Sequence, residues 1–433
     1  MNEKPPAQSA NAAAPALPVA WKAAALLLAM LAATTILSQF FRASTSVIAP
    51  ELIQDLSLSP EALGFASGSF FLALLLPQIF VGVLFDKIGP RITVSALSIL
   101  MVAGALLHAI AASGAGLALA RFVVGLGCAG SFMSAVVLIS RWYPRQSWST
   151  ALSWVFALSQ IGFLLAGLPL AVVTEWIGWR AAFVGMAVVA AIVGFLFFHL
   201  VRDHPPGQQV EATEEELGPI AGLLRVLSTP GLLRVLALFL VAYAAFASVM
   251  LVWAGPYLHD VHGLDTIERG RVLLGMAVVQ TIAGLVIGPL DRVFNTRKWV
   301  AVANATIALG TLLTFALVPS LSLAGAVGLL LLLSSVSAYA SVLLAHIRSH
   351  FPDHLAGRGA TTGNMAQLIG AVLLPIITGF IPPLFPHAGP GYSMLAYQWI
   401  FATLAIALGA GLAVYLTAKD AKPYAVEVMP SES

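Results

Sequence analysis

Long apolar runs recur along the chain, separated by short segments that carry most of the charged residues. Each run is long enough to form a helix of about 20 residues, which spans the roughly 30 Å hydrocarbon core of a bilayer. The runs do not alternate with the period of two that is typical of membrane β-strands. The pattern therefore predicts twelve transmembrane helices, at residues 23–48, 61–84, 92–113, 117–140, 150–174, 181–201, 231–257, 270–290, 299–318, 321–346, 360–381 and 396–417.

One polar segment, residues 202–230, is much longer than the other connections, and its later part, 220–227, is typical of a short interfacial helix. A break at this place gives six helices on each side, which favours an all-α integral membrane fold of two six-helix bundles related by pseudo-two-fold symmetry. The expected organisation is a disordered cytoplasmic tail at 1–20, a bundle at 21–201, a cytoplasmic linker at 202–230, a second bundle at 231–418 and a tail at 419–433.

The composition agrees with a membrane protein and excludes several other classes. Apolar residues make up 59% of the chain and charged residues only 9%, against roughly 25% charged in soluble domains. The net charge of +2 gives no reason to expect a nucleic-acid partner. With Cys128 as the single cysteine, disulfides and cysteine metal clusters are excluded, so we expect no metal and no cofactor.

The distribution of basic residues predicts the orientation. If the N-terminus is cytoplasmic, 16 of the 21 lysines and arginines fall on the inner side, and only Arg180, Arg269 and Arg271 fall outside. An excess of basic residues in inner loops is the rule for membrane helices. We therefore expect both termini in the cytoplasm of a cell with a bacterial-type inner membrane.

Two loops at equivalent places in the two halves share a pattern of a glycine, an acid–base pair and further basic residues. The first contains Gly82, Asp86, Lys87, Gly89 and Arg91, and follows the second predicted helix. The second contains Gly288, Asp291 and Arg292, followed by Arg297 and Lys298, and follows the eighth. The match supports an internal repeat.

With these motifs the sequence resembles the major facilitator superfamily. The first loop is similar to that family's hallmark Gly-x-x-x-Asp-Arg/Lys-x-Gly-x-Arg, and the fourth helix to its Arg-Phe-x-x-Gly-x-Gly pattern, at Arg121 to Gly127. The resemblance implies a transporter that works by alternating access. It also implies a gating role for Gly82, Asp86, Lys87, Gly89 and Arg91, with Asp291 and Arg292 in the second half. The alternative is that the basic residues only set the topology.

Two arginines lie within predicted helices, where charge is costly and points to function. Arg42 shares one helical face with Thr35, Gln39 and Ser46. It faces either a water-filled cavity or the outer interface. Arg121 either contacts the solute or binds a carbonyl of a neighbouring helix, with the small Gly125 beside it. If both arginines face the cavity, an anion is the expected solute, because guanidinium pairs with carboxylates.

Other candidates for solute contact are amides and aromatic residues, each of which has a structural alternative in helix packing or interhelical bonding. The span at 231–257 carries a continuous aromatic face that begins at Tyr243, includes Trp253 and ends at Tyr257. His108 and His346, near predicted helix ends, are interpreted as interfacial. The full set of expected solute-contacting residues is Arg42, Gln39, Arg121, Gln78, Gln160, Tyr243, Trp253, Gln280, Tyr339, Asn364 and Gln367.

The predicted function is secondary transport of a small solute, with an anion favoured. A proton-coupled exporter of drugs or metabolites is the alternative, although the fifth helix lacks a Gly-Pro-x-x-Gly-Gly core; a transport-inactive receptor or assembly factor is a more distant one. No enzyme motif is present. The expected partners are the solute, the lipid bilayer and a proton or counter-ion, and the protein is expected to be a monomer. Every carboxylate falls in a loop, tail or helix end, and Glu51 is the candidate that could titrate from the outside.

Overall fold

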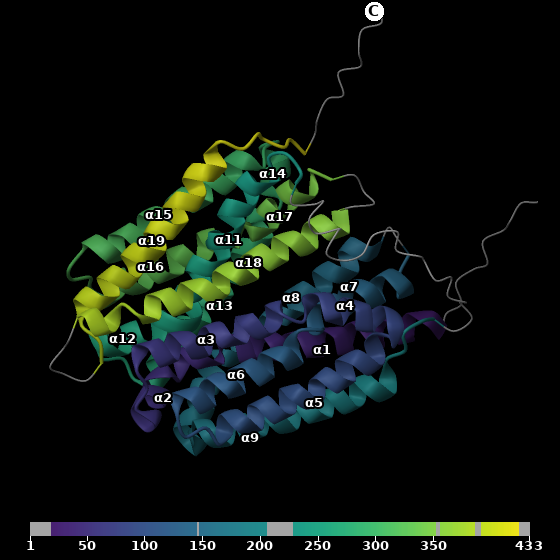
Figure 1. Cartoon of the computed structure of the whole chain (residues 1–433), viewed down its shortest axis with the longest axis horizontal. Coiled ribbons are helices and arrows are strands. Elements are labelled where there is room, and N and C mark those ends of the chain that lie inside the picture. The colour runs from purple at the N-terminus through teal and green to yellow at the C-terminus, as the bar shows by residue number, and fades with distance from the viewer. Residues whose placement is uncertain (1–18, 145–146, 206–227, 352–355, 386–390, 424–433) are drawn as a thin grey trace, which may run out of the picture.

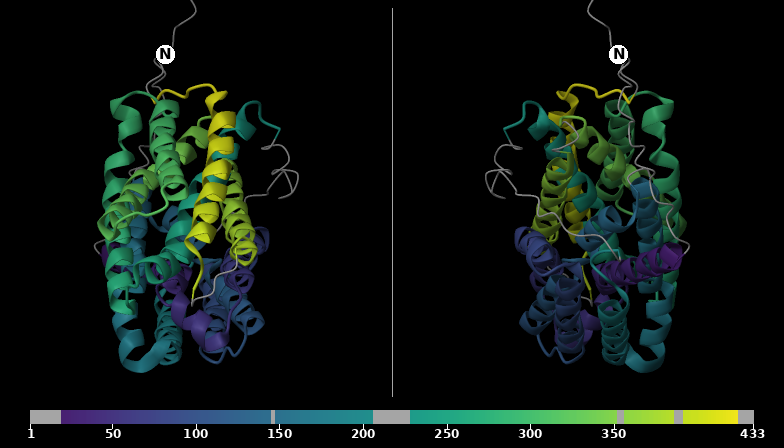
Figure 2. Two further views of the ribbon diagram at one scale, coloured as in Figure 1. Left: turned by 90° about the vertical axis from the view of Figure 1, so that its left-hand side faces the viewer. Right: turned by 90° about the vertical axis from the view of Figure 1, so that its right-hand side faces the viewer.

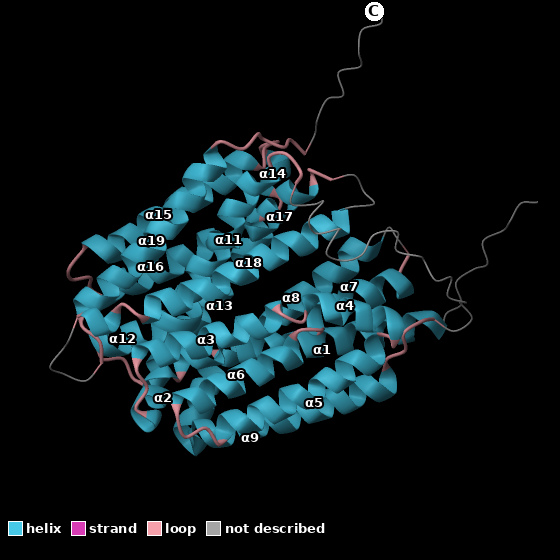
Figure 3. Ribbon diagram, in the orientation of Figure 1, coloured by secondary structure: helices cyan, strands magenta, loops and turns pink. Residues whose placement is uncertain are grey.

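The computed structural model describes residues 19–144, 147–205, 228–351, 356–385 and 391–423, and this part of the chain is helical, with short loops between helices (Figure 3). The first half contains α1 (Val19–Val47), α2 (Ala49–Leu56), α3 (Pro60–Leu75), α4 (Gln78–Lys87), α5 (Pro90–Ala109), α6 (Gly114–Cys128), α7 (Ser131–Trp142), α8 (Trp148–Ala166) and α9 (Leu168–Leu200).

The second half contains α11 (Leu232–Ser248), a π-helix η2 (Val249–Trp253), α12 (Ala254–His262), α13 (Thr266–Ile287), α14 (Leu290–Val293) and α15 (Lys298–Leu317). It continues with α16 (Leu323–Val336), the 3-10 helix η3 (Ser337–Tyr339), α17 (Ala340–Arg348), α18 (Ala356–Gly379), η5 (Pro382–Leu384) and α19 (Met394–Leu416). Most of the expected tails and of the expected linker, with its interfacial helix at 220–227, lies outside the described residues.

The predicted twelve transmembrane helices are confirmed. Ten helical segments of the described chain are long and apolar enough to cross a bilayer. One of them, Thr150–Leu200, is 51 residues long and contains two crossings, because Gly178, with φ 80°, divides α9 into two helices. The remaining crossing consists of α3 and α4 together. Pro77 interrupts the helix between them, but the two helices form one span.

Several spans are broken helices, and the break in the seventh span changes which way its side chains point. The π-helix η2 lies between α11 and α12 and adds a residue to one turn. Tyr243, before it, contacts the first half, whereas Tyr257, after it, packs on Phe315 and Phe401 inside the second half. The continuous aromatic face expected from the sequence is therefore wrong.

The two halves lie side by side (Figures 1 and 2). We call the end where α1 begins and α19 ends, beside α7 and α14, the terminal end, and the opposite end, where α2 and α12 lie, the distal end (Figure 1). The halves meet where α3 packs on α18, α13 on α8 and α9, and η2 and α12 on α1.

The contact between α3 and α18 depends on glycine. A Cβ atom at Gly64 would lie 2.4 Å from the carbonyl oxygen of Pro375, and one at Gly68 would lie 3.0 Å from that of Val372. A side chain at either position would push the backbones apart, so small residues are needed for this close approach. Both contacts lie in the distal half of the molecule, where α3 begins and α18 ends.

Candidate functional site

Arg42 lies on α1 and reaches across to the other half of the protein. Its Nη1 donates a hydrogen bond of 3.0 Å to the Tyr243 hydroxyl of α11, and its guanidinium carbon lies 5.6 Å from the centre of the Phe71 ring. The side chain is half-buried, and its Nε is buried without a hydrogen-bond partner. The guanidinium therefore lies between the halves, and its expected exposure to a water-filled cavity stays a prediction.

Arg121 on α6 is buried, with 2% exposure, and is fixed within the first half. Its Nη1 donates to the carbonyl of Phe41 on α1, and its guanidinium carbon lies 4.7 Å from the centre of the Phe70 ring. A Cβ at Gly125 would lie 2.6 Å from the carbonyl of Phe70, so this glycine permits the close packing of α3 on α6. The structural alternative considered for Arg121, a bond to a neighbouring helix carbonyl, is the one observed.

The polar face of α1 divides among several environments. Thr35 donates to carbonyls of its own helix, and Ser46 accepts from the backbone N–H of Gly255 in the second half. Between them, the side-chain oxygen of Gln39, one turn before Arg42, is buried without a partner, and so is that of Thr45, one turn after. Both oxygens can therefore accept a hydrogen bond from another polar group.

Four residues near the two arginines were not expected as part of the site: Cys128, Ser38, Phe70 and Phe71. Cys128 is buried, and Ser38 of α1 lies near its thiol. The sequence does not single these residues out, because small and aromatic residues are common in membrane helices. Only the packing of α1, α3 and α6 brings them together.

The remaining candidates are spread over both halves. Gln78 donates to the carbonyl of Leu74, one turn earlier in its own chain, and Trp253 is fully buried and donates to the Thr378 hydroxyl on α18. Both bonds are structural. Gln160, Gln280, Asn364 and Gln367 are half-buried, and Tyr339 is buried in η3. The side-chain oxygens of Gln280 and Tyr339 are buried without a partner.

The two histidines interpreted as interfacial are both buried inside the protein, each in the last turn of its helix. His108 stacks on Phe183 with ring centres 3.8 Å apart. His346 hydrogen-bonds the Tyr415 hydroxyl and the carbonyl of Lys419. Each histidine lies on the side of its helix that faces its own bundle, which a position near a helix end does not reveal.

The first-half loop motif fastens α5 to the end of α9. Gly89 has φ 86°, and a Cβ there would lie 2.3 Å from the carboxylate of Asp203. That carboxylate accepts from the backbone N–H of Arg91, while the Arg91 Nε donates to the carbonyl of Phe198. Gly82 lies against Met133 of α7, and Lys87 is exposed. The side chain of Asp86 lies outside what the structure describes, so its expected gating role stays a prediction.

The second-half loop repeats this arrangement with different residues. Asp420, just after α19, accepts from the backbone N–H of Lys298 at the start of α15, and the Lys298 ammonium donates to the carbonyl of Leu416. Asp291 is buried and pairs with Arg297 at 3.4 Å, and Arg292 is exposed. The expected internal repeat thus has a counterpart in the contacts of the two loops.

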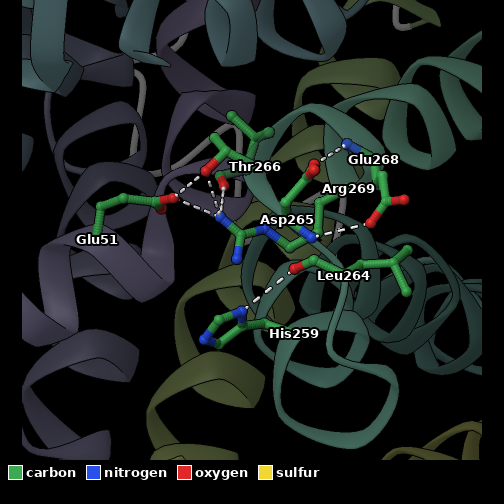
Figure 4. Close-up of polar contacts among 8 residues, drawn as sticks. Glu51, His259, Leu264, Asp265, Thr266, Glu268 and Arg269 are labelled. Atoms are coloured by element: carbon green, nitrogen blue, oxygen red, sulfur yellow. Dashed lines mark hydrogen bonds and ion pairs between the residues drawn. The ribbon is translucent and has the colours of Figure 1, made fainter.

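Two ion pairs occupy the distal end, both with a carboxylate on α2. Glu51 pairs with Arg269 of α13, in the other half (Figure 4). Asp55, one turn later, pairs with Arg180 within the first half, and the Trp179 indole N–H and the Arg180 guanidinium hold the pKa of Asp55 below its usual range. The sequence placed these arginines outside but could not pair residues so distant in the chain.

The comparisons with known proteins agree with this arrangement. The Major Facilitator Superfamily model matches residues 31–375. The chain is 26% identical over 361 residues to the probable sulfoacetate transporter SauU of Cupriavidus necator, covering 78% of this chain and 83% of that protein. It is 23% identical over 377 residues to the probable galactarate/D-glucarate transporter GudP of Escherichia coli, with coverages of 78% and 83%.

The fold is also similar to that of a bacterial homologue of the human lysosomal transporter Spinster, solved in an inward-facing and unoccupied conformation. The TM-score is 0.76 at 19% identity, covering 92% of this chain and 97% of that one. Together with the matched family model and the twelve-helix architecture, these findings identify a transporter fold rather than an enzyme. The chain belongs to the major facilitator superfamily.

Proposed function

We propose that the protein is a secondary transporter that moves a small organic or inorganic anion across a bacterial-type inner membrane by alternating access. The observation that carries this proposal is the Arg42 guanidinium, held between the halves by a neutral phenol, Tyr243. A half-buried cation that has no carboxylate partner among the described residues favours an anionic ligand, because guanidinium binds carboxylates through two parallel, charge-assisted hydrogen bonds. The unpartnered Nε of Arg42 is one of the donors such a ligand would use.

The surroundings of Arg42 support the same solute class. Arg121 adds a second positive charge in the same bundle, and its bond to the Phe41 carbonyl fixes the backbone next to Arg42. We assign Arg121 a positioning role and Arg42 the direct contact. Gln39 and Tyr243 are suited to bind further polar groups of the solute.

The named relatives carry related chemistry. Sulfoacetate, galactarate and D-glucarate, the solutes in the names of two relatives, are all organic acid anions. The distribution of basic residues supports a cytoplasmic terminal end. With that orientation, the close contacts at the distal end correspond to a state closed toward the outside.

The test is uptake of sulfoacetate and D-glucarate into liposomes that contain the purified protein. Arg42→Ala removes a charge-assisted pair worth about 3 kcal/mol or more, so we expect at least a roughly hundredfold loss of uptake. Arg271→Ala, which removes an exposed arginine of α13, is the control and should keep wild-type rates.

Ligand-induced thermal shift separates binding from transport. We expect the anions, and not neutral or cationic analogues of similar size, to raise the Tm of the wild type, because a ligand that binds only the folded state stabilises it. Arg42→Ala should lose this shift. Equal stabilisation of both proteins by an anion would contradict the assignment of Arg42.

A further inference from the structure

The distal end contains a network in which one buried arginine joins the two halves. Arg269 Nη2 donates to the Glu51 carboxylate at 2.5 Å and to the Val47 carbonyl at 3.3 Å (Figure 4). Thr266, one turn before Arg269, donates its hydroxyl to the same carboxylate oxygen of Glu51. Two donors of α13 therefore converge on one carboxylate of the other half.

The burial of this pair is asymmetric. The Arg269 side chain is 1% exposed and the Glu51 side chain 26%. A buried guanidinium is costly unless a carboxylate compensates its charge, and removal of one partner of such a pair is strongly destabilising. Glu51 supplies that compensation only while the first half lies against the second.

The neighbouring ionisable groups are engaged in bonds within the second half. Asp265 and Glu268 form the capping box that starts α13. His259 contacts the carbonyl of Leu264, and the Asp260 carboxylate accepts from the Tyr397 hydroxyl (Figure 4 shows His259). The ionic contact of Arg269 with Glu51 is thus distinguished from its surroundings because it crosses between the halves.

We propose that Glu51 and Arg269 form an electrostatic latch that holds the distal end closed and thereby sets the equilibrium between the two states of the transporter. The latch rests on the proposed alternating access. In the closed state the pair is buried and bonded; when the halves part, both side chains enter water and each is solvated separately. An ion pair shifts the equilibrium between two states by the difference between its free energy in one state and its free energy in the other.

Distance measurements between spin labels test the latch directly. Labels at Ala112→Cys and Ser320→Cys, exposed positions of distal loops in the first and second half, report the opening of the distal end, in a Cys128→Ala background. Glu51→Gln leaves Arg269 buried without its partner in the closed state alone. We expect the ratio of closed to open molecules to fall about tenfold to a hundredfold.

Asp55→Asn is the matched control, because Asp55 lies one turn from Glu51 and its ion pair stays within one half. It should leave the distance distribution unchanged. The charge exchange E51R/R269E should return the distribution toward that of the wild type. If Glu51→Gln does not fold, Thr266→Val, which removes the second donor to Glu51, is the milder variant and should shift the ratio in the same direction.

An unchanged distribution in Glu51→Gln, or in Thr266→Val where that variant replaces it, overturns the latch, as does an equal shift in Asp55→Asn. The measurement needs no transport. If the wild type carries none of the anions tested but Glu51→Gln still opens the distal end, the latch stands and the proposed solute class falls. If the anions are carried and the distances do not respond, the solute class stands and the latch is wrong.

Discussion

The two ends of the molecule are held together in different ways. The distal end contains bonds that run between the halves, the pair of Glu51 with Arg269 and the bond from Gly255 to Ser46, beside the Asp55–Arg180 pair that stays within the first half. At the terminal end the bonds described above close each half on itself, through Asp203 in the first and Asp420 in the second. Bonds at the distal end join the two halves, whereas the bonds at the terminal end hold the helices of each half together.

This difference is what a rocking transporter needs. Bonds within a half keep its helices in register while it moves, whereas bonds between halves are made in one state and lost in the other. A variant that removes a bond between the halves at the distal end should therefore change the equilibrium between states. A variant at the terminal end should change the stability of one half and leave that equilibrium unchanged.

The largest effect is expected at the seam of α3 and α18. Gly64→Val places carbon atoms where the Pro375 carbonyl lies, and overpacking of this kind costs about 3 kcal/mol, or about a hundredfold in the closed state. The distance between labels at residues 112 and 320 should become that of the open form. Gly185→Val, at a position where a Cβ meets nothing within 4 Å, is the control; similar distances in both variants would contradict the seam's role.

A smaller effect is expected from the bonds within each half. Asp203→Asn and Asp420→Asn each weaken a charged cap at a helix N-terminus, worth about 1 kcal/mol. The Tm should fall by a few degrees in both variants, and the label distance should stay that of the wild type. A change in distance without a change in Tm would remove the distinction between the two ends.

The smallest effect is a dependence on pH at the second of these caps. Burial raises the pKa of Asp420, but hydrogen bonds from the Thr296 hydroxyl and the Lys298 backbone outweigh it and leave the pKa below the ordinary 3.8. The folded state thus favours the carboxylate, and its stabilisation is present above pH of about 4 and is lost as the pH falls through the lowered pKa. The difference in Tm between the wild type and Asp420→Asn should therefore disappear on acidification. A difference that stays constant as the pH falls below about 4 would assign the effect to packing.

The helices, their number and the repeated loops could be predicted because they follow from hydrophobic runs and local motifs. The partners of the charged residues could not. Arg42 meets Tyr243 and Glu51 meets Arg269 across more than 200 positions of the chain, and such pairs depend on how the halves pack. The position of Trp253 was missed for a local reason: η2 adds a residue to the turn, so regular spacing no longer indicates a common face.

Ser67, which lies between Gly64 and Gly68 on α3, has a consequence for the open state. Ser67 is buried, and its hydroxyl has no hydrogen-bond partner. Separation of α3 from α18 would admit water to this hydroxyl, and hydration of an unmet polar group recovers about 1 kcal/mol or more. The same separation would uncover the carbonyl oxygens of Pro375 and Val372, against which Gly64 and Gly68 pack in the closed state. The surfaces of α3 and α18 that meet in the closed state thus carry polar groups that water can reach in the open state.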